Sequence, residues 1–256
     1  MASSRRTVST DVNRPLFLLP APQVYTSEFI PQPAGTPQSD PLRKDIFNGR
    51  LLKDLTLVHP YQIPQIDPCL AIPEKLVSFT EAMGRHAPDP TAWVHFYEDD
   101  YKFERWWKHP EKYFEHLSGF GGIISPDFSL YANMPAAQQI ANTYKNYLLG
   151  AWAQHRGLPV IANVRLTTAQ SISYALAGSP RHSTIALGLH GCIKDKDNRR
   201  QVMEEMRVIC DFLDPAHILI YGSEAYGVAT PALERGIPVH VYKPDSWTRS
   251  RERVAA

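Results

Sequence analysis

The segments ILIYG at residues 218–222 and PVHVY at residues 238–242 establish the class of fold. Both are continuous apolar runs rich in β-branched and aromatic residues, which is typical of strands buried on both faces of a parallel sheet. Further runs of this kind occur upstream, and helical patterns separate them. The candidate strands are residues 93–97, 122–125, 159–164, 184–189, 218–222 and 238–242.

The segments between these strands have helical spacing. Pro135 suits the first position of a helix whose apolar residues recur every three or four positions up to Gly157. Residues 197–214 keep the same spacing, and Pro110 is expected to interrupt the helical pattern of residues 103–117. This alternation predicts an α/β protein with a mostly parallel sheet of repeated βα units.

Right-handed crossovers would bring the carboxyl ends of all the strands to one edge of the sheet. Six or seven strands are too few for a closed eight-stranded barrel. We therefore expect an open doubly wound sheet as first choice and a partial or irregular barrel as second. Residues 1–45 are rich in Pro, Ser, Thr and Gln and are expected to form an extended N-terminal arm, with residues 46–256 as a single α/β domain.

Composition excludes several classes of protein. The 27 basic and 26 acidic residues nearly cancel, so overall charge favours neither a nucleic-acid nor a membrane partner. No run approaches the roughly 18 apolar residues that cross a bilayer, so no membrane partner is predicted. The 3 cysteines lack a CxxC pair, which indicates a cytoplasmic protein without a disulfide framework. The P-loop, GxGxxG, HExxH and GxSxG motifs are absent from the sequence.

Polar residues follow each predicted strand, and in α/β folds ligands bind outside these carboxyl ends. Such a set of carboxylates, amides, one guanidinium and one imidazole suits a phosphorylated ligand or a divalent metal ion, and it equally suits an internal ion-pair network. The sequence contains no spacing typical of a known metal site, so the identity of any metal is left open. The candidate catalytic residues are Asp100, Asp127, Arg165 and His190.

Arg165 is the most informative of these residues, because a guanidinium at the end of a buried strand needs an anionic partner, either Asp127 or a ligand. Asp100 and Asp127 are candidate metal ligands or general bases. The helix after Pro135 also carries an amide stripe, Gln139, Asn142 and Asn146, which either lines a pocket or faces solvent. The candidate ligand-binding residues are Ser129, Gln139, Asn142, Asn163, Gly191, Ser223 and Glu224.

Residues 96–222 resemble DUF4417, a family of uncharacterised proteins from bacteria, phages and other mobile elements. The resemblance lies in FGGIISPDFSLYANMPAAQQIANTYKN (120–146), GLPVIANVRL (157–166), ALGLHGCIK (186–194) and DPAHILIYGS (214–223). The resemblance adds Tyr131 to the ligand-binding candidates but implies no established activity. The sequence departs from the family pattern at Lys145, Ala162 and Leu166. The pattern matches at Asp127, Ser129, Tyr131, Pro135, Gln139, Asn142, Tyr144, Asn163, Arg165 and Gly191.

Three hypotheses about function follow. The leading one is that the strand-end edge binds a nucleotide or nucleic-acid phosphate, and whether the protein then processes it is left open. The alternative is a non-catalytic accessory of phage or plasmid replication that binds DNA or a protein through the N-terminal arm and the basic tail of residues 247–256. The third is that the polar edge is an internal network that stabilises the fold.

Overall fold

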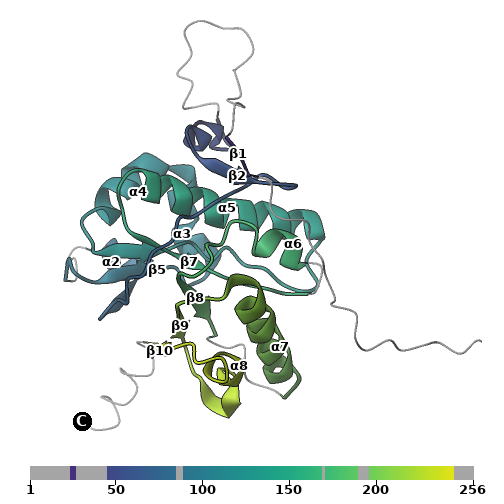
Figure 1. Ribbon diagram of the computed structural model, residues 1–256. Coiled ribbons are helices and arrows are strands. Elements are labelled where there is room, and N and C mark those ends of the chain that lie inside the picture. Colours follow the sequence, from purple (N-terminus) through teal and green to yellow (C-terminus); the bar gives the residue numbers. More distant parts are fainter. Residues whose placement is uncertain (1–23, 27–44, 85–88, 169–170, 190–195, 245–256) are drawn as a thin grey trace, which may run out of the picture.

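The computed structural model describes residues 24–26, 45–84, 89–168, 171–189 and 196–244 (Figure 1). Its centre is a parallel sheet of seven strands whose spatial order follows the chain. Six of these strands coincide with the predicted ones to within one or two residues at each end. The strands are β4 (Leu76–Ser78), β5 (Trp93–His95), β6 (Gly122–Ile124), β7 (Val160–Asn163), β8 (Thr184–Gly188), β9 (His217–Tyr221) and β10 (Val239–Tyr242).

The sheet confirms the predicted α/β class and corrects its arrangement. All six neighbouring pairs are parallel. A strictly sequential order has no switch point at which the crossovers change face, so helices cover one side only and the sheet curls into a half-barrel. The doubly wound arrangement is therefore wrong, and the partial barrel is confirmed.

Helices connect each strand to the next (Figure 1). Pro110 separates two helices, as predicted, and Pro135 is the N-cap of the longest one. The helical elements of these connections are α2 (Phe79–Ala82), α3 (Asp100–Lys108), α4 (Pro110–Leu117), α5 (Ala136–His155), α6 (Ile172–Ala175), α7 (Lys196–Leu213), the 3-10 turn η3 (Ala225–Gly227) and α8 (Thr230–Leu233).

The two faces of the sheet carry different cores. On the helix-covered face, strand residues such as Val94 and Val160 pack with helix residues such as Trp106 and Leu148. Alternate residues point to the opposite face, as the pleat of a strand requires. That face forms a small cluster without helix residues, made of Trp93, Ile124, Ile161, Ala186 and Leu219.

An irregular segment, residues 66–73, covers part of the helix-free face. Its Cys69 carbonyl accepts a hydrogen bond from the Thr184 amide at 2.9 Å, and the Cys69 amide donates to Ser183 Oγ at 2.9 Å. Farther along, the Tyr242 hydroxyl donates to the Pro73 carbonyl at 2.5 Å. The segment is thereby tied to β8 and β10, and it shields the apolar cluster from water.

A second, antiparallel sheet lies against α5 (Figure 1). It consists of β1 (Val24–Thr26), β2 (Thr56–Val58) and β3 (Ile63–Pro64), and the 3-10 turn η1 (Gly49–Leu52) precedes β2. β1 belongs to the predicted N-terminal arm and pairs with β2. The proposed division at residue 45 stays a prediction. In the described part of the chain, no helix has the length and apolar character needed to cross a membrane.

The close contact of α5 with the sheet can be tested at Gly150. A Cβ there would lie 2.8 Å from Ile66 Cδ1 and 2.9 Å from Ser125 Cβ. We expect Gly150→Ala to lower the free energy of unfolding by about 1–3 kcal/mol through overpacking, measured by chemical denaturation. Helix propensity acts in the opposite direction, because alanine is favoured over glycine by about 1 kcal/mol.

Ala141→Gly, on the exposed side of the same helix, is the matched control. It should lose only the propensity difference, about 1 kcal/mol. A Gly150→Ala protein more stable than wild type would contradict the close packing of α5 on β6.

Candidate functional site

Asp127 and Arg165 meet at the carboxyl edge of the half-barrel. They follow β6 and β7, which are parallel neighbours. Arg165 Nη1 lies 2.8 Å from Asp127 Oδ2, and Asn163 Nδ2 donates to Asp127 Oδ1 at 2.8 Å. The partner of Arg165 is therefore Asp127, as one of the two sequence interpretations held. Asp127 is 7% exposed, whereas the Arg165 side chain is 27% exposed and reaches the surface.

Burial controls the protonation of this pair. Desolvation raises the pKa of Asp127, while Arg165 and Asn163 act in the opposite direction by stabilising the carboxylate. The carboxylate of Asp100 also raises the pKa of Asp127, which places these two predicted residues near each other. The edge therefore combines a desolvated acid with a cation that solvent can reach.

Asp100, Ser129, Tyr131 and Asn142 are brought together by the loop after β6. Asp100 Oδ1 accepts a hydrogen bond from Ser129 Oγ at 2.8 Å, and Asp100 Oδ2 accepts one from the Ser129 amide at 3.1 Å. Asn142 Nδ2 donates to the Ser129 carbonyl at 2.8 Å, and the Tyr131 hydroxyl donates to Ser129 Oγ at 3.2 Å. These contacts fix the loop that carries Asp127.

The other two amide side chains of the stripe on α5, those of Gln139 and Asn146, also form hydrogen bonds with loops. Gln139 and Asn146 are each 4% exposed, so the solvent-facing alternative is wrong for them. Gln139 Oε1 accepts from the hydroxyls of Thr167 at 2.7 Å and Tyr174 at 2.9 Å. Asn146 bonds both the amide and the carbonyl of Phe128. The bonds of these amides are internal ones, which agrees with a positioning role.

The other predicted site residues are placed differently. His190 and Gly191 lie outside the described residues. Ser223 Oγ accepts from the Ala225 amide at 3.0 Å and so closes the turn after β9, while Glu224 is exposed. Within the part of the chain that the structure describes, neither Ser223 nor Glu224 bonds to Asp127 or Arg165.

The structure adds an aromatic group that the sequence did not single out. The rings of His95 and Tyr221 lie 4.2 Å apart, and Tyr97 stacks on both, at 5.4 and 5.0 Å. Gly188 makes room for this stack, because a Cβ there would lie 2.5 Å from the Tyr97 ring. Tyr97 Oη donates to Asn163 Oδ1 at 3.1 Å, which connects the aromatic rings to Asp127.

Two of the titratable groups in the stack, His95 and Tyr97, are held neutral. Burial lowers the pKa of His95 from 6.5 to about 3, and its Nδ1 accepts a hydrogen bond from the Tyr97 amide at 3.2 Å. Burial and the nearby Asp127 raise the pKa of Tyr97 well above its ordinary value. His95 therefore acts as an uncharged acceptor, and Tyr97 as a donor that orients Asn163.

Glu205, on α7, is a second feature of this edge that the sequence did not single out. Burial raises the pKa of Glu205 to about 7, whereas Gln201 and the charge of Arg165 act to lower it. Gln201 Nε2 donates to Glu205 Oε1 at 2.8 Å and to the Thr167 carbonyl at 2.9 Å, which ties the helix to the loop after β7. A carboxyl group that titrates near neutral pH is suited to proton transfer.

Metal ligation has little support among the described residues. They contain no group of three or more His, Cys, Asp or Glu side chains arranged to hold a metal ion. The oxygens of Asp127 and Asp100 are already hydrogen-bonded to Asn163, Arg165 and Ser129.

Comparison with known proteins places this arrangement in a family. A family model described as domain of unknown function (DUF4417) matches residues 55–232. The chain belongs to the DUF4417 family. The matched region contains every described residue of the strand-end site, from His95 to Tyr221, and it ends within α8.

Two phage proteins are related to this DUF4417 member. The Gene 1 protein of Mycobacterium phage L5 is 29% identical over 221 residues, which cover 85% of this chain and 93% of the relative. The Gene 1 protein of Mycobacterium phage D29 is 28% identical over 198 residues, which cover 76% of this chain and 71% of the relative. No solved structure matches the chain.

The neutral, buried state of His95 predicts a pH-dependent stability. Below pH 6.5 the unfolded chain gains a proton on His95 that the native protein does not take up until about pH 3. This residue should therefore cost about 3 kcal/mol of stability between pH 6.5 and pH 4. We expect the stability difference between wild type and His95→Phe to change by this amount when both are denatured with urea at a series of pH values.

His155→Phe serves as the control, because His155 is exposed at the end of α5. A His95→Phe difference that does not change with pH would show that His95 takes up its proton in the native protein as readily as in the unfolded chain.

Proposed function

We propose that the strand-end edge binds a nucleotide or nucleic-acid phosphate, with Arg165 as the cation that contacts it. The observation that carries this proposal is the position of Arg165. Its guanidinium is fixed by Asp127 at 2.8 Å and yet is 27% exposed at the carboxyl edge, where ligands bind in parallel α/β folds. An oriented guanidinium matches the geometry of a phosphate.

The surroundings of Arg165 favour an anion. Asp127 pairs with one guanidinium nitrogen, Nη1. Burial raises the pKa of Glu205 to about 7, so Glu205 carries only part of its negative charge at neutral pH. Glu205 would also exchange a proton with a bound ligand if the site carries out a reaction. His95 and Tyr97 would hold Asn163 in place without contacting the ligand.

Aromatic side chains on the loops around this edge support a nucleotide or single-stranded nucleic acid. Tyr131, after β6, is 54% exposed, and Tyr226, after β9, is 65% exposed. The guanidinium of Arg199 lies 3.5 Å from the centre of the Tyr226 ring, which places a cation beside an exposed aromatic face. Base stacking on aromatic residues next to cations is the usual means of binding single strands.

The accessory hypothesis concerns the N-terminal arm and the basic tail. Apart from β1, these segments lie outside the described residues, so the structure adds no observation in its favour.

A thermal-shift panel tests the proposal. Mononucleotides, a short single-stranded DNA and a short duplex, each with and without Mg²⁺, are added to the purified protein. A ligand at 100 times its Kd stabilises the native state by about 2.7 kcal/mol, which raises Tm by roughly 5 °C or more. We expect such a shift with one ligand class, and we expect Arg165→Gln combined with Asp127→Asn to abolish it.

The double variant removes both charges, because losing Arg165 alone would leave the buried carboxylate of Asp127 without its cation. Arg181→Gln is the control, since Arg181 is exposed just before β8, at the opposite edge of the sheet. A shift that survives in the double variant would move the binding site elsewhere. No shift with any ligand would favour an internal stabilising network.

The pKa of Glu205 predicts how ligand affinity depends on pH. As the pH rises through about 7, Glu205 ionises and its negative charge weakens the attraction of Arg165 for a phosphate. We expect the Kd of the ligand found in the panel to increase between pH 6 and pH 8, measured by isothermal titration calorimetry. Glu205→Gln should flatten this dependence, and Glu204→Gln, on the exposed side of α7, should preserve it.

A further inference from the structure

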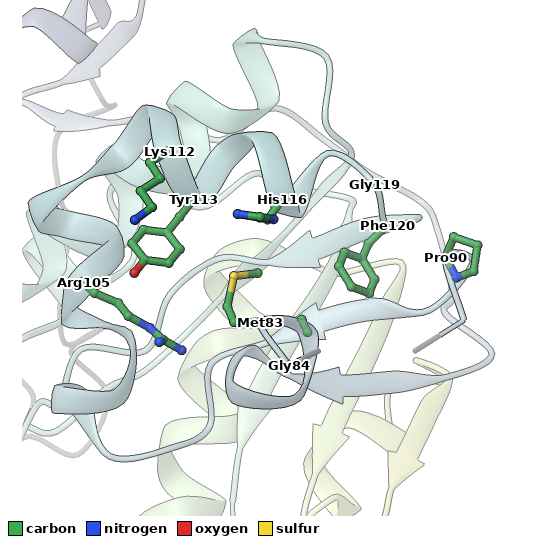
Figure 2. Close-up of a pocket in the computed structure, with 10 residues that line it drawn as sticks. Met83, Gly84, Pro90, Arg105, Lys112, Tyr113, His116, Gly119 and Phe120 are labelled. Atoms are coloured by element: carbon green, nitrogen blue, oxygen red, sulfur yellow. The ribbon is translucent and has the colours of Figure 1, made fainter. Parts of the chain in front are cut away.

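A cavity lies between α2, α3, α4 and the turn that leads into β6 (Figure 2). Its volume is about 540 Å³, which is within the range of roughly 300–1,000 Å³ typical of small-molecule sites. None of the strand-end residues lines it. The cavity is therefore separate from the site proposed above.

Among the described residues that line the cavity, three carry basic side chains and none carries an acidic one. Arg105, Lys112 and His116 line it. In the described part of the chain none of these three forms an ion pair. Two neighbouring acids are engaged elsewhere, because Glu104 pairs with Lys108 at 2.8 Å and Glu111 with Arg50 at 3.0 Å. Glu115, which precedes His116, does not line the cavity. The positive charge of the cavity is thus not neutralised by its own helices.

Arg105 is fixed and incompletely bonded. Its guanidinium lies over the rings of Phe79 and Tyr113, at 5.0 and 5.5 Å from their centres. These contacts orient the group and separate part of it from water. Arg105 Nε is buried and has no hydrogen-bond partner. A buried charged donor without an acceptor is costly, so a bound anion would lower the free energy of this side chain.

The two ends of the cavity differ in character. Figure 2 shows Arg105, Lys112 and the hydroxyl of Tyr113 at one end, with Phe120 and Pro90 at the other and Met83 between them. Met83 and Phe120 offer apolar surface, and a thioether beside an aromatic ring accommodates flat groups of varied shape. The cavity therefore pairs a cationic end with an apolar end.

We infer that this cavity binds a small organic oxyanion, with its carboxylate or phosphate group on Arg105 and Lys112 and a flat apolar body against Met83 and Phe120. Any small molecule that carries both an oxyanion group and a flat apolar body meets these requirements. An inorganic ion would use the cationic end alone. A neutral aromatic molecule would use the apolar end alone and leave Arg105 Nε without an acceptor.

The test uses four probes on the full-length protein in isothermal titration calorimetry. Phenyl phosphate and benzoate carry both features, inorganic phosphate only the charge, and benzyl alcohol only the ring. We expect at least one of the first two to bind at least about tenfold more tightly than either single-feature probe. The one that binds more tightly shows whether the cationic end prefers a phosphate or a carboxylate group.

The variants Arg105→Gln and Lys112→Gln should each weaken that binding about tenfold or more. Glutamine cannot replace the guanidinium over the two rings, so Arg105→Gln can also disturb folding. Lys112 is exposed, and its replacement therefore tests the proposal even if Arg105→Gln melts without cooperativity. Lys108→Gln is the nearby control, because Lys108 pairs with Glu104 and does not line the cavity. It should bind the probes as wild type does.

Three results would overturn the inference. The first is no binding of phenyl phosphate or benzoate at millimolar concentration. The second is equal affinity for inorganic phosphate and phenyl phosphate, which would make the apolar end irrelevant. The third is binding that persists in Lys112→Gln but is lost in the Arg165→Gln and Asp127→Asn double variant, which would assign the probes to the strand-end site.

Discussion

The desolvation of Asp127 governs the organisation of the strand-end site. A carboxylate that is 7% exposed is costly unless charged or polar donors surround it. Arg165 and Asn163 supply those donors from the neighbouring strand, and Tyr97 orients Asn163 from the end of β5. Parallel pairing is what makes this possible, because it brings consecutive strand ends to one edge. Removing the pairing would leave a buried acid without its charged donor.

The interior of the half-barrel is polar but uncharged next to this pair. His95, Tyr97 and Tyr221 stack in the space that Gly188 leaves, and burial keeps the imidazole and the phenol neutral. Glu205, on α7, adds a carboxyl group with a pKa of about 7 whose charge interacts with that of Arg165. The interior groups next to Arg165 are neutral, and its guanidinium reaches the surface. Its positive charge therefore lies where a ligand would arrive from solvent.

The cavity between α2, α3 and α4 holds its cation in a different way. There the rings of Phe79 and Tyr113 hold Arg105 without an acidic side chain in the cavity wall, so its charge is available to a ligand. At the strand ends, by contrast, Asp127 compensates most of the charge of Arg165 and fixes its direction. Both arrangements lie within the DUF4417 match of residues 55–232, one at the carboxyl ends of β6 and β7 and the other among α2, α3 and α4.

Local patterns in the sequence were sufficient to predict the repeated βα units and one contact of the site, the one between Arg165 and Asp127. Continuous apolar runs such as ILIYG identify buried strands whatever their neighbours, and Pro110 interrupts a helix wherever it occurs. The need of Arg165 for an anion pointed to Asp127, because the cost of desolvation follows from residue type and strand position. β4 was missed because only two consecutive apolar residues, Leu76 and Val77, mark it in the sequence.

Other features arose only from the tertiary structure. Strand order is not encoded in any local run, so the sequence could not distinguish the doubly wound sheet from the half-barrel. His95 and Tyr97 read as ordinary core residues of a strand, and Glu205 as one acid among several on a helix. Their shifted pKa values come from burial, and burial is produced by distant segments. The same holds for the cavity, whose lining residues meet only when α2, α3 and α4 pack together. Sequence determines which side chains are costly to bury, and the tertiary structure determines which of them are buried and beside which partners.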